Sequence, residues 1–278
     1  SEIKLAHVHN TGLSLQSDSS QLLFGADNDI NLTHVHNTGL TTNGNLSLKS
    51  DSSVLKFGAD EEVTLTHNHN AGLTLGGTTP TLTIGDAGAE DTKIVFDGNA
   101  QDFHIGLDDS ADSLTIGLGS ALGTTSHMVF DANGHITQPL QSAFFAKLSV
   151  DHNNITDETN QTIFFGTEIF DQNSDYNTNG TFTAPVAGKY LLMFHLRLET
   201  LDTTPNTYDF NLATSNRSYT HRFDPDLADY DANFYHVNLT VLADMDANDT
   251  SLINYYQDGG GAQTDIDPSS FFMGYLVC

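Results

Sequence analysis

Short runs of alternating apolar and polar residues follow one another along the whole chain. Leu, Ile, Val and Thr fill these runs, and Gly, Asp and Asn interrupt them roughly every ten residues. Such alternation places successive side chains on opposite faces of a β-strand. No window shows the period of an amphipathic helix, so the sequence predicts an all-β protein.

The first part of the chain is repetitive. The segment QLLFGADNDINLTHVHNTGL, which begins at Gln21, aligns with VLKFGADEEVTLTHNHNAGL, which begins at Val54, with a step of 33 residues. A shorter copy, AHVHNTGL, begins at Ala6 and lies 27 residues before its counterpart. Because the step is not constant, we expect hairpin-like units rather than a strict solenoid.

The last part of the chain has longer apolar runs, separated by loops rich in Asp, Asn and Gly. Strands are predicted over residues 143–150, 162–170, 188–199, 208–214, 232–243, 251–257 and 271–277. Around ten strands without a helix indicate a β-sandwich of the jelly-roll type. Tyr190, Leu192 and Phe194 share one strand face and should fill its core. Gly188 should permit a turn into the same strand.

Composition places a boundary between these two parts. Residues 1–140 contain five Phe and no Tyr, whereas residues 141–278 contain twelve Phe and all nine Tyr. Glycine is distributed the other way, with sixteen in the first part and seven in the second. We therefore predict a thin, repetitive β-rich domain over residues 1–140 and a compact domain with an aromatic core over residues 141–278.

Each copy of the repeat carries a His-x-His pair that continues an apolar strand face. In the second copy Ile30, Leu32, His34 and His36 alternate along the chain, so all four lie on one side of the strand. A segment with so few aromatic residues cannot bury that face alone, and we expect chains to associate along a common axis. Three chains would bring six imidazoles together, which forms an octahedral site for a transition metal. The predicted ligands are His7, His9, His34, His36, His67 and His69. The alternative is that these histidines are buried or stacked without metal.

The formal net charge of −27 restricts the partners of the chain. It arises from 36 acidic and nine basic residues, and Lys and Arg form no cluster. Nucleic acids and anionic lipid surfaces bind through clustered Lys and Arg, so neither is an expected partner. No apolar run has the length of a membrane helix, and we expect no membrane insertion. Cys278 is the only cysteine and can pair only between chains. The first residues resemble the middle of a repeat, so we expect residue 1 to lie within a longer polypeptide.

Two acidic loops in the last part of the chain suit calcium, which prefers carboxylate and amide oxygens. The candidate ligands are Asp224, Asp226, Asp229 and Asp231 in one loop and Asp244 and Asp246 in the other. Neither loop is an EF-hand. The second begins as that motif does, but Asp249 and Tyr255 stand where the motif requires Gly and Glu. The alternative interpretation is that both are solvated acidic loops.

The three His-x-His pairs resemble those of the receptor-binding tail fibres of bacteriophages, in which three intertwined chains hold metal ions on their axis. The stretch DGNAQDFHIGLDDSADSLTIGLGSALG, which begins at Asp97, is similar to structural proteins of marine phages. This resemblance covers the first half of the chain. It implies a homotrimeric fibre shaft that holds iron, or alternatively zinc or nickel, as a cofactor shared by three chains.

Residues 163–196, IFFGTEIFDQNSDYNTNGTFTAPVAGKYLLMFHL, resemble the globular head of the q subunit of the first complement component, within the tumour-necrosis-factor superfamily of trimeric jelly rolls. The matching signature positions are Phe165, Asp171, Tyr176, Phe182, Gly188, Tyr190 and Phe194. The ending SSFFMGYLVC is similar to the last strand of that family. Two departures are a Tyr176-to-Phe182 spacing one residue short and Leu192 where the family usually has Phe. The resemblance implies a jelly-roll head domain and a homotrimer.

The two resemblances together imply a structural and adhesive protein, not an enzyme. No nucleophile elbow, phosphate-binding loop or zinc-protease helix occurs in the sequence, so we expect no catalytic residues. The expected role is a homotrimeric tail fibre of a virion whose head binds a host-surface carbohydrate or protein through residues that the sequence does not identify. A secreted cellular filament or adhesin subunit, extracellular or on the cell surface, is the alternative. A fibre-borne glycan hydrolase is a further one.

Overall fold

The computed structural model describes residues 21–24, 30–35, 39–43, 46–50, 53–57, 63–70, 72–155, 158–226 and 232–278. Every regular element within these ranges is a β-strand, which confirms the predicted all-β class. The described residues include no helix long and apolar enough to cross a membrane. The chain divides into two compact units, residues 1–83 and 84–278. The boundary predicted near residue 140 falls inside the second unit, between a five-stranded sheet and a β-sandwich.

The first unit contains two antiparallel sheets of three strands each. They are formed by β1 (Gln21–Phe24), β2 (Ile30–Val35) and β3 (Gly39–Thr42), and by β4 (Val54–Phe57), β5 (Val63–Asn68) and β6 (Gly72–Gly76). Their registers are equivalent at positions 33 residues apart. His34 pairs with Leu40 in the first sheet, as His67 pairs with Leu73 in the second.

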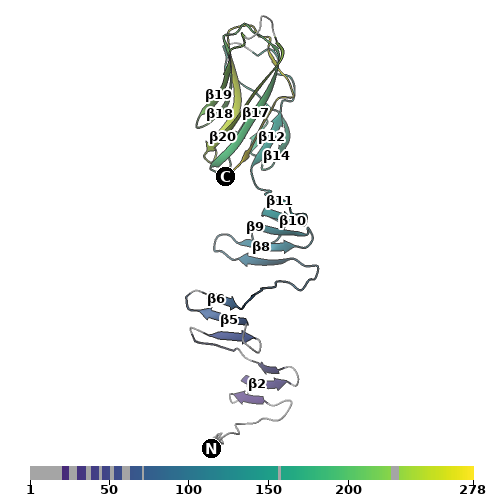
Figure 1. Cartoon of the computed structure of the whole chain (residues 1–278), viewed down its shortest axis with the longest axis vertical. Helices are drawn as coiled ribbons and strands as arrows, with labels where there is room; N and C mark the ends of the chain where they lie inside the picture. The colour runs from purple at the N-terminus through teal and green to yellow at the C-terminus, as the bar shows by residue number, and fades with distance from the viewer. Residues whose placement is uncertain are drawn as a thin grey trace, which may run out of the picture. The chain divides into compact units, whose positions relative to one another are not determined.

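The second unit begins with a five-stranded antiparallel meander (Figure 1). Its strands are β7 (Thr92–Phe96), β8 (Phe103–Asp108), β9 (Ser113–Leu118), β10 (Ser126–Asp131) and β11 (Ile136–Thr137). Each strand pairs with the next in sequence, because the connecting segments are short turns. Among the described residues, these five strands form a separate sheet that pairs with no other strand.

The rest of the second unit is a sandwich of two antiparallel sheets. One sheet has the order β14 (Thr167–Asp171), β12 (Ala143–Lys147), β23 (Phe271–Leu276), β17 (Gly188–Leu201), β20 (Ala232–Met245), with β22 (Asp265–Ile266) paired to β17. The other has the order β15 (Tyr176–Asn177), β16 (Thr181–Thr183), β21 (Thr250–Asp258), β18 (Thr207–Thr214), β19 (Ser218–Phe223), with β13 (Gln161–Thr162) paired to β21. Several neighbouring strands, such as β12 and β23 or β16 and β21, are far apart in sequence, as in a jelly roll. We call residues 141–278 the head.

Aromatic side chains fill the space between the two sheets of the head. Tyr190, Leu192 and Phe194 are each fully buried, which confirms their predicted place in the core. The ring of Phe144 lies 4.9 Å from that of Tyr176 and 4.8 Å from that of Phe182, stacked in both cases. Burying side chains of this size contributes about 1.5–3 kcal/mol each, so the aromatic cluster is the main stabilising element of the head.

Two details of the head differ from the sequence prediction. The apolar run predicted as one strand over residues 162–170 is interrupted, because the chain crosses there from β13 in one sheet to β14 in the other. Ile163 and Phe165 are fully buried in that crossover. Gly188 does not form a turn but is the first residue of β17. A Cβ on Gly188 would lie 2.8 Å from the carbonyl oxygen of Cys278, so the close approach of the chain end requires glycine.

Candidate functional site

The predicted shaft ligands are only partly within the described residues. His67 and His69 are described and both are exposed. His34 lies on β2, whereas His7, His9 and His36 lie outside the described residues. Within the described part of one chain, no three His, Cys, Asp or Glu side chains come together in a way that could hold a metal ion. The shaft metal site stays a prediction.

His67 lies on an apolar strand face, as the parity of the sequence predicts. Its cross-strand partner is Leu73, and the next pair on the same face is Leu65 with Leu75. Leu73 and Leu75 are exposed, and so is Phe57, which pairs with Val63 on this face. The sheet therefore presents apolar side chains and an imidazole together without covering them.

In the five-stranded sheet, the face with polar side chains is buried and the face with apolar side chains is exposed. Ser113, Thr115 and His104 are buried on one face of β8 and β9. The opposite face carries exposed apolar side chains, which we call the β7–β9 face: Ile94, Phe96, Phe103, Ile105, Leu107 and Leu114. Six such side chains, each about half exposed, leave on the order of 500 Å² of apolar surface uncovered. That area is at the upper limit for a patch on a monomeric protein.

The face with the buried polar side chains is covered by the segment that follows β9 and contains Gly119 and Leu122. Gly119 accepts a hydrogen bond at its carbonyl oxygen from Nδ1 of His104, at 2.8 Å. A Cβ on Gly117 would lie 2.7 Å from Cε1 of His104, so glycine makes room for the ring. Leu122 packs against Gly106, where an added Cβ would lie 2.9 Å from its Cδ2. The polar face is thus closed within one chain, and only the β7–β9 face remains open.

A second open apolar face lies on the head, on the side of the β14–β12–β23–β17–β20 sheet that points away from the core. We call it the β17 face. Its apolar members are Phe145, Phe170, Leu191, Met193, Leu242, Phe271, Met273 and Tyr275. The ring of Phe145 stacks on Phe271 at 5.0 Å and on Phe170 at 6.2 Å. Phe170 remains 51% exposed and Leu242 58% exposed, so the face is ordered by its own contacts but uncovered.

Two histidines meet on the same face, although each is isolated in the sequence. His195 on β17 and His236 on β20 lie on neighbouring strands, with Nε2 of His195 3.1 Å from Nδ1 of His236. Burial lowers the pKa of His195, and repulsion from His236 lowers it further. Their sequence separation of 41 residues hides the pair, because only the β17–β20 register brings them together.

The predicted calcium ligands are separated by the fold. Asp224 and Asp226 lie beside a polar depression of about 320 Å³, whereas Asp229 and Asp231 lie outside the described residues. Asp226 donates its backbone N–H to Oδ1 of Asp224 at 3.0 Å, as in an Asx turn. In the other loop, Asp244 forms an ion pair with Arg217 at 2.8 Å. Asp246 is exposed. The calcium site stays a prediction.

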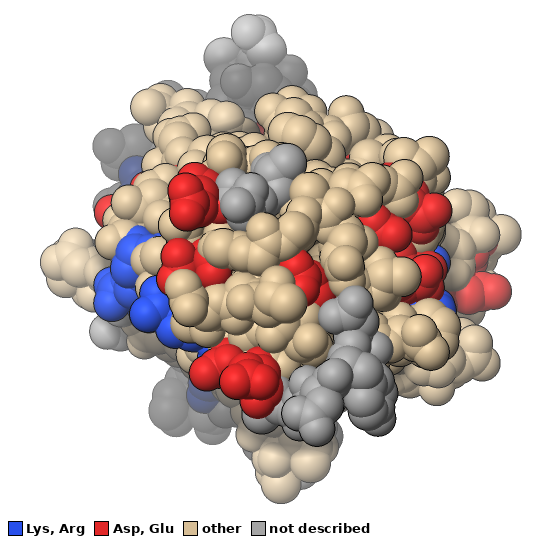
Figure 2. Space-filling view, turned by 90° about the horizontal axis from the view of Figure 1, so that it is seen from above, with Lys and Arg blue, Asp and Glu red and all other residues tan. Residues whose placement is uncertain are grey.

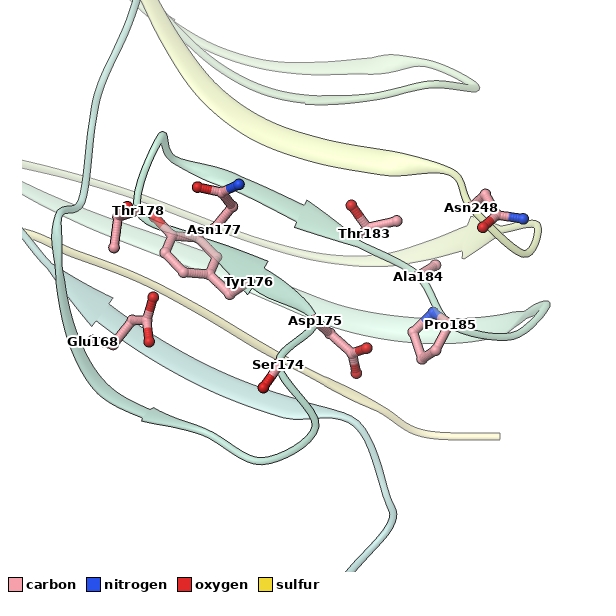
Figure 3. A pocket seen from close by; sticks show the side chains of 10 residues that line it. All are labelled: Glu168, Ser174, Asp175, Tyr176, Asn177, Thr178, Thr183, Ala184, Pro185 and Asn248. Carbon is pink, nitrogen blue, oxygen red and sulfur yellow. The ribbon is translucent and has the colours of Figure 1, made fainter.

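A larger polar depression of about 500 Å³ lies on the head, where the loop before β15 meets β16 and the turn between β20 and β21 (Figure 3). Its wall carries two carboxylates, Glu168 and Asp175, which Figure 3 shows apart from each other. Oδ2 of Asp175 is buried and has no hydrogen-bond partner in the chain. Burial raises the pKa of Tyr176, and the Glu168 carboxylate adds to the shift. The Tyr176 hydroxyl donates to the carbonyl oxygen of Phe165 at 3.1 Å.

Side chains of this depression suit a polar ligand. Amide and hydroxyl groups from Asn177, Thr183 and Asn248 join the two carboxylates, so hydrogen-bond donors and acceptors predominate over apolar groups. On the face of the molecule shown in Figure 2, acidic side chains are scattered among uncharged ones, and Lys and Arg appear only toward the edges. The Lys and Arg side chains that this face shows gather at its edges, beside acidic side chains.

Residues 143–277, slightly less than half of the chain, match the family model described as C1q domain. No curated protein matches the sequence. Among solved structures, the globular domain of the zebrafish complement 1qA protein is 18% identical, with 50% of this chain and 98% of that chain covered and a TM-score of 0.37. Murine APRIL is 10% identical, with 49% and 99% covered and a TM-score of 0.37. Eiger TNF from S. frugiperda is 12% identical, with 50% and 92% covered and a TM-score of 0.34.

The family match and the strand arrangement identify the head as a C1q-like jelly roll, as the sequence resemblance predicts. Domains of this family are structural and ligand-binding domains rather than enzymes, in agreement with the expectation that the chain is not an enzyme. The match does not extend to residues 1–142. The resemblance of that part to bacteriophage tail fibres stays a prediction.

Proposed function

We propose that this chain is one subunit of a homotrimeric structural and adhesive fibre, a receptor-binding tail fibre whose C1q-like head contacts the host surface. The observation that carries the proposal is the β7–β9 face, where one chain covers its polar residues and leaves its apolar residues exposed. Association with further copies of the chain would remove these apolar side chains from water, which favours assembly.

The β17 face supports the same assembly at the head. C1q domains form homotrimers, and the β17 face supplies an aromatic surface through which copies can pack. Each copy has a net charge of −27, so copies repel one another over most of their surface. Three of the nine basic residues, Lys147, Lys189 and Arg197, lie on the β17 face beside two acidic ones, Glu199 and Asp244. This face therefore does not share the excess of negative charge of the whole chain.

The same assembly provides a role for the histidine pairs of the shaft. His67 lies on an exposed apolar face, and one chain supplies too few ligands for a metal site among its described residues. In a trimer, the His34/His36 and His67/His69 pairs are each presented three times, and six imidazoles suit iron, zinc or nickel. The metal would fasten the three shafts together, because every chain contributes ligands to it.

Adhesion is assigned to the head. C1q-type domains typically occur in extracellular or secreted proteins, and the depression around Glu168 and Asp175 offers carboxylate, amide and hydroxyl groups. Such groups bind the hydroxyls of a carbohydrate, which makes a host-surface glycan the favoured ligand over nucleic acid or lipid. The virion is the proposed location of the fibre.

Sedimentation of the full chain tests the assembly. The expected mass is about three times 30.1 kDa, and a monomer at micromolar concentration would refute the proposal. Adhesion is tested by binding of the fluorescent full chain to host cells. Glu168→Gln and Asp175→Asn should reduce binding, and the matched control Asp246→Asn, on an exposed loop elsewhere, should not. Immunogold electron microscopy of the source particles should label tail fibres, and label on cell surfaces instead would favour a cellular filament.

A further inference from the structure

We infer that His195 and His236 together bind one transition-metal ion on the β17 face of the head. The two residues belong to the long paired strands β17 and β20, where Arg197 pairs with His236 and His195 pairs with Asn238. The two histidines are therefore diagonal neighbours on one sheet face. Their rings lie 5.1 Å apart between centroids and are inclined by 30°. This pair is separate from the His-x-His pairs of the repeat.

The distance between the two nitrogen atoms fits a shared metal ion. A zinc ion bonded to two imidazole nitrogens at about 2.0–2.1 Å holds them roughly 2.9–3.4 Å apart, depending on the coordination geometry. Nε2 of His195 and Nδ1 of His236 are 3.1 Å apart. The N···N distance of the pair therefore already lies in the range that a shared metal ion requires, and metal binding would displace the proton that lies between the two nitrogens. Imidazole pairs of this kind suit zinc, copper and nickel.

The surroundings hold His195 in place. Its ring stacks on Phe271 at 5.4 Å with an inclination of 23°, so the apolar face fixes its orientation.

The nearest cationic side chain on β17 is directed away from the pair. Arg197 makes an ion pair with Glu199 at 2.7 Å and a longer one with Asp267 at 3.5 Å. Its guanidinium also lies over the ring of Phe234, 4.5 Å from the centroid. These contacts hold the Arg197 guanidinium toward Glu199, Asp267 and Phe234.

The two rings supply two ligands, and the described part of one chain holds no third acidic, histidine or cysteine side chain in position. Water completes the coordination in a single chain. In the trimer, a neighbouring copy can supply the remaining ligands, because the β17 face is its contact surface. This last step rests on the proposed function, whereas the two-histidine site does not.

Zinc content of the purified full chain tests the inference. The protein is dialysed against zinc at low micromolar free concentration, and bound zinc is counted by mass spectrometry. His195→Gln and His236→Gln should each reduce the bound zinc by up to one ion per chain relative to wild type. The matched control His221→Gln removes a head histidine from β19, in the other sheet, and should leave the count unchanged. His236→Cys replaces one zinc ligand by another and should retain zinc.

Equal zinc in wild type, His195→Gln and His236→Gln would overturn the inference. Light scattering on the same samples separates it from the assembly proposal. A monomeric wild type that loses zinc on His236→Gln keeps the metal site and refutes the trimer. A trimeric wild type whose zinc content is insensitive to both substitutions refutes the site alone.

Discussion

Replacement of Ile105 by Asp should abolish the assembly of the fibre. Ile105 lies near the centre of the β7–β9 face, between Ile94 and Ile116 on the neighbouring strands. In one chain its side chain is 37% exposed. Full burial of such a side chain contributes about 1.5–3 kcal/mol, so completing its burial contributes roughly 0.5–1 kcal/mol per copy.

From this estimate, two substitutions of Ile105 should weaken the assembly to different extents. Ile105→Ala removes roughly 1.5–3 kcal/mol over three copies, which weakens association by a factor of about 10–150. Ile105→Asp also places three carboxylates in an apolar contact, and each unpaired buried charge costs several kcal/mol. The aspartate variant should therefore be monomeric where wild type is trimeric.

The assay is sedimentation velocity of the full chain over a dilution series. Gln101→Asp is the matched control, because it adds the same charge at an exposed loop position between β7 and β8. Circular dichroism should show native β-structure in both variants. If Ile105→Asp assembles as tightly as Gln101→Asp, the β7–β9 face is not a contact between copies, and the reasoning is refuted.

Three further predictions concern stability and metal content. Burial lowers the pKa of His152 from its ordinary 6.5, so below about pH 6.5 the unfolded chain binds a proton that the folded head does not. Calorimetry should therefore show that the head becomes less stable as the pH is lowered through this range, and that the loss is smaller in His152→Gln. Gly117→Ala forces a Cβ to 2.5 Å from the Thr125 carbonyl oxygen and should destabilise the five-stranded sheet by roughly 1–3 kcal/mol in thermal melts; no change would contradict the packing described. Combined His67→Gln and His69→Gln should remove one metal ion per trimer by elemental analysis, and unchanged metal would exclude that site.

Much of the fold can be predicted from the sequence, because strand parity is a local property. Alternation along residues 188–199 places Tyr190 and Phe194 in the core, and both are fully buried. The apolar run at residues 162–170 misleads for a physical reason. Ile163 and Phe165 are buried as strand residues would be, yet they lie in the crossover between sheets. Burial alone does not distinguish a strand from a crossover.

The sites were harder to predict than the fold, since they depend on register and on competing partners. His195 and His236 meet only because β17 and β20 pair with one particular register. Asp244 has the right chemistry for calcium, but Arg217, 27 residues away in sequence, binds its carboxylate. Neither relation leaves a signal at short sequence spacing. A His-x-His pair is visible in the sequence because its members are only two residues apart, although β5 ends at Asn68 and His69 lies in the turn after it.

The difference between the cross-strand pair His195/His236 and the His-x-His pairs predicts the order in which the two kinds of site bind metal. The proposed shaft site takes two imidazoles from each of three chains, so one chain supplies only two of its six ligands. The cross-strand pair already has its nitrogens 3.1 Å apart. The head pair should therefore bind metal in isolated chains, and the shaft pairs only after three chains have associated. Dilution to monomers should empty the shaft first.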